Sequence, residues 1–132
     1  MKSKVYVETT VISYLAALPS SDVVLAAHQQ ITCEWWQRRD RFDLFVSQAV
    51  LREAARGDVE AAARRLAAVE QVSALAVGAE ASQLAERFLR MRVIPAKAEV
   101  DAVHIAVAVV NGMDYLLTWN CSDFVKSPVR PA

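Results

Sequence analysis

The chain lacks a net charge, because its 15 Lys and Arg residues balance its 15 Asp and Glu residues. Proteins that hold nucleic acid by bulk charge carry a strongly basic balance, so the composition excludes that mode of binding. Contact with nucleic acid would need local arginine clusters, each of which, taken singly, we interpret as a solvated helix face. Three such clusters occur: Arg38, Arg39 and Arg41; Arg64 and Arg65; and Arg87, Arg90 and Arg92.

Cysteine and histidine are scarce, with two residues of each. Cys33 and Cys121 lie far apart without a CxxC motif, and His28 and His104 lack the spacing of zinc ligands. The pattern predicts two ordinary thiols in a reduced protein. We interpret His104, which falls in an apolar helical segment, as a hydrogen-bonded core histidine rather than a metal ligand.

Long apolar runs are also missing. The longest, residues 105–110, is far too short to cross a bilayer. The N-terminus begins with a strand pattern and lacks the layout of a signal peptide. We therefore expect a cytoplasmic location and no membrane association.

What the chain does contain suits a single domain spanning residues 1–132. A chain of this size can bury about two thirds of its unfolded surface without disulfides or metals. The composition is 55% hydrophobic, with a mean hydropathy of +0.20. These values predict a well-covered sheet and allow an additional apolar surface for oligomerisation.

Strand and helix patterns alternate along the chain. Alternation of this kind is typical of an α/β protein in which a parallel sheet is covered on both faces. Thr9 or Thr10 is a plausible cap for the first helix, and Ser47 for the helix that Gly57 ends. The predicted strands are 4–7, 41–46, 72–77 and 115–118, and the predicted helices are 11–18, 22–39, 48–56, 58–70, 81–89 and 97–110.

The helix predicted over 22–39 carries an apolar stripe that ends in two tryptophans. Its spacing favours core packing over a platform for stacking bases. Trp35 and Trp36 would equally suit an exposed surface used for dimerisation. The stripe consists of Val24, Ala27, Ile31, Trp35 and Trp36.

Acid and amide side chains fall at the ends of apolar elements. Glu8 and Asn120 each follow a strand, so both should lie at the carboxyl edge of a parallel sheet, where sites form in such folds. Taken singly, these residues have simpler explanations. Glu8 could be an exposed strand-end residue, Glu53 could pair with Arg56, and Asp101 could be an acid favoured by a helix N-terminus. Asp123 could start a turn or cap a helix.

Taken together, the acids indicate a metal site. Two carboxylates about 5 Å apart repel by roughly 3 kcal/mol at an effective dielectric constant near 20. Mg²⁺ or Mn²⁺, which take oxygen ligands, would relieve that repulsion. A divalent ion can bind phosphate oxygens and lower the pKa of water, which is the chemistry of phosphodiester hydrolysis.

Four segments in order resemble PIN-domain proteins, specifically the toxin ribonucleases of the VapC type. The segments are YVETTVISYL, SQAVLREA, EVDAVHIAVA and GMDYLLTWN. The resemblance implies a three-layer α/β/α sandwich with a central parallel sheet of four or so strands. It also implies a Mg²⁺- or Mn²⁺-dependent endoribonuclease, a homodimer, and an antitoxin that blocks the site.

The same resemblance assigns site residues. Glu8, Glu53 and Asp101 would be the acidic metal ligands, and Asn120 would occupy the place of a fourth acid. Thr10 matches a hydroxyl near the metal. Asp123, three residues after Asn120, could substitute for that fourth acid or contact the substrate.

The chain departs from the pattern in three ways. Glu8 stands where the family usually has Asp, and Asn120 removes one negative charge. Nine residues follow Asp123, fewer than the family's last helix and strand require. An RNA- or protein-binding module without nuclease activity is therefore an alternative, and a structural domain whose acids are caps and surface residues is a third.

Overall fold

The computed structural model describes residues 1–91 and 99–120, and these contain one four-stranded parallel sheet. The strand order is β3-β2-β1-β4, so the first strand lies inside the sheet. Val5 pairs with Leu44 on one side and with Tyr115 on the other. The strands are β1 (Ser3–Val7), β2 (Phe42–Ser47), β3 (Ser73–Leu75) and β4 (Tyr115–Leu117).

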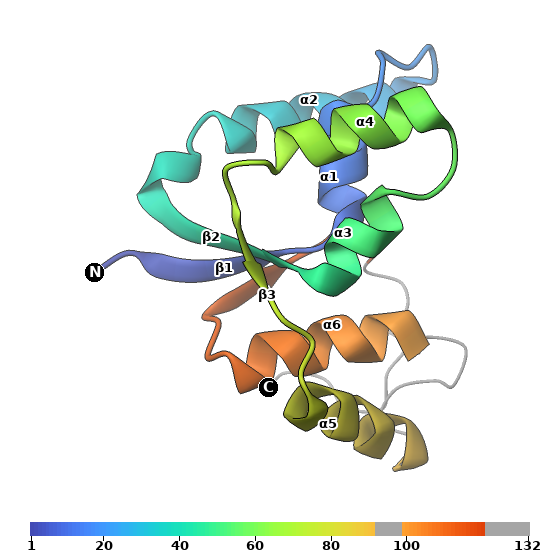
Figure 1. Cartoon of the computed structure of the whole chain (residues 1–132). Coiled ribbons are helices and arrows are strands. Elements are labelled where there is room, and N and C mark those ends of the chain that lie inside the picture. The colour runs from blue at the N-terminus through green and yellow to red at the C-terminus, as the bar shows by residue number, and fades with distance from the viewer. Residues whose placement is uncertain (92–98, 121–132) are drawn as a thin grey trace.

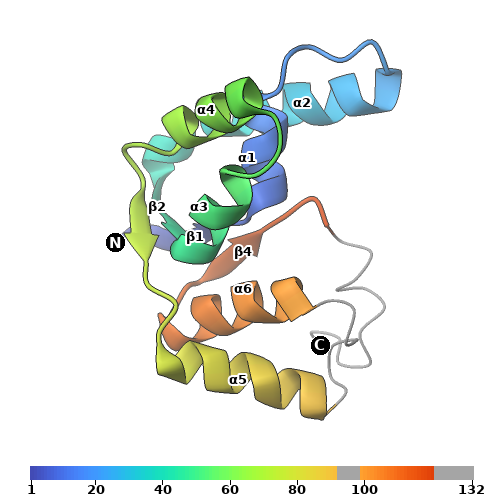
Figure 2. The same ribbon diagram turned by 45° about the vertical axis from the view of Figure 1, so that its right-hand side comes forward.

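The helices form a layer on each face of this sheet. α1 to α4 lie on one face, while α5 and α6 pack together on the other (Figures 1 and 2). The helices are α1 (Thr9–Ala16), α2 (Val23–Trp36), α3 (Gln48–Ala54), α4 (Val59–Ala68), α5 (Ala79–Arg90) and α6 (Glu99–Val110), with the short 3-10 helix η1 (Arg39–Arg41) before β2. The predicted three-layer α/β/α sandwich is confirmed.

The core lies on both sides of the second half of β1, which explains the unbroken apolar run from Val5 to Val7. Val5, Tyr6 and Val7 are all buried, as expected for a central strand covered on both faces. On α6, Ala102 and Ala106 are completely buried, and their small side chains let this helix lie close to the sheet.

The structure contains both the cap and the glycine turn that the sequence predicted at the two ends of α3. Ser47 accepts a hydrogen bond from the Val50 N–H at 3.3 Å, which confirms it as the N-cap. Gly57 follows the helix with a φ of +84°, a left-handed conformation that favours glycine. At α1 the cap prediction was wrong, because the N-cap is Glu8 and the hydroxyls of Thr9 and Thr10 bond to carboxylates instead.

The structure corrects the expected burial of α2. Trp35 packs against the core, but Val24 is 61% exposed and Ile31 53%, and Thr32 is the helix's fully buried residue. α2 lies on the outside of its layer and packs mainly on α1, so one narrow strip of it is covered (Figure 1). Spacing alone predicted an apolar face without showing how much of it another element would cover.

Element boundaries differ modestly from the expected ones. β3 has three residues, whereas the pattern predicted a strand over 72–77, and α2 ends at Trp36 before η1. The predicted start of the last helix, at residues 97 and 98, lies outside the described residues. No helix within 1–91 and 99–120 combines the length and hydropathy needed to span a membrane.

Candidate metal centre

The end of β1 places Glu8 in a nearly closed environment. Its side chain is 4% exposed, and Oε1 accepts hydrogen bonds of 2.6 Å from both the Thr10 and Thr118 hydroxyls. The backbone N–H of Trp119 donates to the Thr10 hydroxyl, and that of Asn120 donates to the Thr118 hydroxyl, each at 2.9 Å. Because both threonine oxygens accept from N–H groups, their own protons are directed to the carboxylate. Thr10 thus lies beside Glu8.

Glu53 reaches the same region from α3. Its Oε1 accepts hydrogen bonds from the Thr9 hydroxyl and from His104 Nε2, the latter at 3.0 Å. Partial burial on its own raises the pKa of Glu53, but the hydrogen bonds from His104 and Thr9, with the nearby charge of Arg56, outweigh it and lower the pKa below its ordinary value of 4.5. Glu53 is therefore ionised at neutral pH. If the acids were only helix caps and surface residues, no lowered pKa would be expected at Glu53.

The sequence predicted a hydrogen-bonded core histidine at His104, but it did not predict the contact of this side chain with Glu53. His104 is completely buried and hydrogen-bonded on both ring nitrogens, as expected for a core histidine, yet Nε2 faces Glu53. The available signal was its position three residues after Asp101, a spacing that places both side chains on one face of a helix.

Three elements thereby bring three ligand-type groups together. One carboxylate oxygen of Glu8, one of Glu53 and a ring nitrogen of His104 all lie within 4.8 Å of one another. In both carboxylates Oε1 accepts two hydrogen bonds, while Oε2 accepts none from any residue of the described part. Each acid therefore keeps one oxygen for a cation, and the donor set fits a hard divalent ion.

Asp101 and Asn120 form a second pair next to this group. Asp101 is 7% exposed, and the Asn120 Nδ2 group lies 3.2 Å from its Oδ1 and 3.1 Å from its Oδ2. Asp101 is not a member of the trio found among the described residues. The neutral amide of Asn120 sits beside a buried carboxylate, where another acid would repel it. Asp123, the remaining predicted site residue, falls in 121–132 and outside the described residues.

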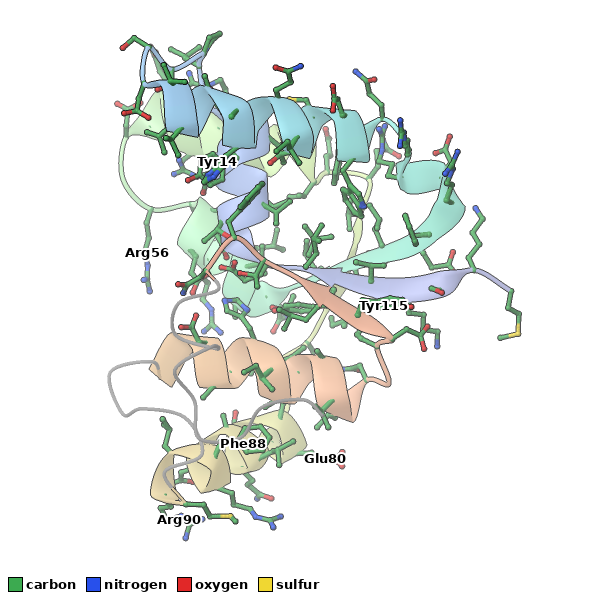
Figure 3. The ribbon with its side chains drawn as sticks, turned by 180° about the vertical axis from the view of Figure 1, so that it is seen from behind. Tyr14, Arg56, Glu80, Phe88, Arg90 and Tyr115 are labelled. Atoms are coloured by element: carbon green, nitrogen blue, oxygen red, sulfur yellow. The ribbon has the colours of Figure 1, made fainter. Side chains whose placement is uncertain are left out.

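Both arginines on α4 are structural. Arg64 donates to the carbonyl oxygen of Ala16, and Arg65 donates to that of Ala54, so α4 is fastened to α1 and α3. Figure 3 shows Tyr14 and Arg56 towards the carboxyl ends of the strands, whereas Tyr115 marks the opposite end of β4.

Comparison with known proteins bears on the fold. No protein-family model and no curated protein sequence matches the chain. Among solved structures, the chain is similar to Mycobacterium tuberculosis VapC20, a toxin that cleaves the sarcin–ricin loop. The TM-score is 0.69 at 20% sequence identity, and the alignment covers 96% of this chain and 99% of that one. The expected architecture is therefore confirmed: the chain has the PIN-like fold of a VapC-type toxin.

Proposed function

We propose that the protein is a metal-dependent endoribonuclease that cleaves RNA phosphodiester bonds, and that it is the toxin of a toxin–antitoxin pair. The observation that carries the proposal is the convergence of Glu8 and Glu53, each with one oxygen left by its hydrogen bonds, at the carboxyl edge of a parallel sheet. The similarity to a toxin that cleaves the sarcin–ricin loop supports the choice of a nuclease.

Mg²⁺ or Mn²⁺ would be held by the oxygens of Glu8 and Glu53. When bound, such an ion neutralises phosphate oxygens and lowers the pKa of water. The chain's own part is to hold the ligands still: Thr10 and Thr118 orient Glu8, while Thr9 and His104 orient Glu53.

Asp101 and Asn120 complete the proposed site as the third acid and an amide oxygen ligand, and Asp123 as a substrate contact or replacement ligand. An amide at position 120 supplies an oxygen without a charge, so the site should bind Mg²⁺ more weakly than one with four acids would. We further propose a homodimer, an antitoxin partner that covers the site, and a cytoplasmic location. The exposed apolar residues of α2, including Val24 and Ile31, are in keeping with a covered surface.

Cleavage of single-stranded RNA tests the proposal. Purified protein with Mn²⁺ or Mg²⁺ should cut the RNA, excess EDTA should stop the reaction, and Asp101→Ala should lower the rate at least a hundredfold. Asp43→Ala, at an exposed position on β2, is the matched control and should keep the wild-type rate. Cleavage that persists in EDTA would contradict the proposal. Equal cleavage rates for Asp101→Ala and Asp43→Ala would contradict it as well.

A binding module without nuclease activity is the second candidate. The amide of Asn120 favours it, because this side chain contacts both oxygens of Asp101 where a fourth acid would stand. Calorimetric titration with Mn²⁺ separates the two. Clear binding that Mg²⁺ displaces supports the enzyme, whereas absence of binding together with retention of RNA supports the module.

A further inference from the structure

A chain of buried hydrogen bonds runs behind the candidate metal centre and ends on Glu53. Ser47, Tyr6 and His104 are each completely buried, and they come from β2, β1 and α6. The Ser47 and Tyr6 hydroxyls lie 2.7 Å apart, and the Tyr6 hydroxyl lies 2.6 Å from His104 Nδ1. His104 Nε2 then lies 3.0 Å from Glu53 Oε1.

The direction of the protons along this chain follows from its two ends. At one end the Val50 N–H can only donate, so the Ser47 oxygen accepts and its own proton is available for Tyr6. At the other end the ionised Glu53 can only accept. Running from Ser47 to Tyr6 to His104 Nδ1, and from Nε2 to Glu53, every donor meets one acceptor.

The reverse direction leaves groups unsatisfied. A proton on His104 Nδ1 would turn the Tyr6 proton towards Ser47, whose own proton would then have no acceptor among the described residues. The Nε2 lone pair would also face a carboxylate oxygen at 3.0 Å. An unpaired buried hydroxyl is itself unfavourable. The environment therefore selects the tautomer with its proton on Nε2.

We infer that Tyr6 and His104 are positioning residues, which fix the carboxylate of Glu53 so that Oε2 is the oxygen presented to a divalent cation. The inference rests on the proposed function, since it assigns these residues a part in the same site. It also excludes His104 as a direct ligand. Nε2 keeps its proton and donates it in a hydrogen bond to Glu53, so this nitrogen has no lone pair for a metal.

Nitrogen-15 NMR of the metal-free protein tests the tautomer without any activity assay. At about pH 8, where an ordinary imidazole is neutral, His104 should show a protonated Nε2 and an unprotonated Nδ1. His28, the second histidine, gives a reference in the same spectrum. A proton on Nδ1 in the wild type would overturn the inference.

Mn²⁺ calorimetry then tests the positioning role. His104→Leu should weaken binding about 10–100-fold, as loss of a group that orients a metal ligand typically does. His104→Gln, whose amide can still donate to Glu53, should recover most of the affinity. Val107→Ala, completely buried on the same helix, should lower stability but leave Mn²⁺ affinity within about twofold. If His104→Leu does not fold, Tyr6→Phe is measured in its place. This variant should also weaken Mn²⁺ binding, but by a smaller factor.

The outcomes separate the two claims. Wild-type affinity in His104→Leu, or in Tyr6→Phe when that variant replaces it, would overturn the positioning role and leave the proposed function intact. A wild-type protein that binds no Mn²⁺ would overturn the proposed function and the positioning role with it. The proposed function and the positioning role are both supported if His104→Leu lowers the Mn²⁺ affinity, His104→Gln recovers it, and Val107→Ala leaves it unchanged.

Discussion

Three threonine hydroxyls donate to the two carboxylates at the edge of the sheet, and this arrangement explains how the acids are tolerated there. Thr9 bonds to Glu53, while Thr10 and Thr118 bond to Glu8. Hydroxyl donors stabilise a buried carboxylate as solvent would, and hydrogen bonds to charged groups are stronger than neutral ones. The threonines thus allow the acids to stay near one another although both are largely buried.

Replacing Thr10 with Val should destabilise the protein. The change removes one donor to Glu8 and leaves the Trp119 N–H without its acceptor, so the free energy of unfolding should fall by about 1–3 kcal/mol. Urea denaturation measures this. Thr10→Ser, which restores the hydroxyl, is the matched control and should recover most of the loss. Equal stability of the Val and Ser variants would show that the hydroxyl contributes nothing.

The lowered pKa of Glu53 predicts a pH dependence of stability. The ionised form is favoured in the folded protein, so its contribution is complete above the ordinary pKa of 4.5 and is lost as the pH falls through the lower folded pKa. The stability advantage of the wild type over Glu53→Gln should shrink as the pH falls below the ordinary pKa of 4.5. Glu80→Gln, at an exposed position on α5, should show no such change. A constant difference for Glu53→Gln would contradict the pKa direction.

At the scale of helices and strands, the sequence predicted most of the architecture. Apolar runs that end in a polar residue, as at Glu8 and Asn120, marked two strands and the edge where their polar ends meet. Ser47 marked a helix start because its hydroxyl is a local cap. The exposure of α2 was not predictable in this way, since burial of its apolar stripe depends on which elements pack against it.

The fit of α6 to the sheet can be tested by overpacking. Ala106 is completely buried on α6, and Ala106→Leu would force extra methyl groups into a filled interface. The free energy of unfolding should fall by about 1–3 kcal/mol. Val109→Leu, at a position on the same helix that is 59% exposed, should stay within about 0.5 kcal/mol of the wild type. A neutral Ala106→Leu would mean that α6 and the sheet do not pack as closely as described.

At the scale of the whole molecule, the candidate site joins the two helical layers. Glu53 comes from α3 on one face of the sheet, and His104 and Asp101 come from α6 on the other (Figure 2). Glu8 and Asn120 follow the strands between them. Sequence spacing could place each acid at the end of an element, but the part played by His104 required the docking of both layers. The site therefore exists only in the complete sandwich.

The central claim is that Glu8 and Glu53 hold a divalent cation. A crystal structure of the protein grown with Mn²⁺, with anomalous scattering recorded, tests it most directly. We expect an anomalous peak within about 2.0–2.6 Å of an oxygen from each of these two carboxylates. Ordered carboxylates with no anomalous peak between them at saturating Mn²⁺, or Mn²⁺ bound elsewhere on the protein alone, would contradict it.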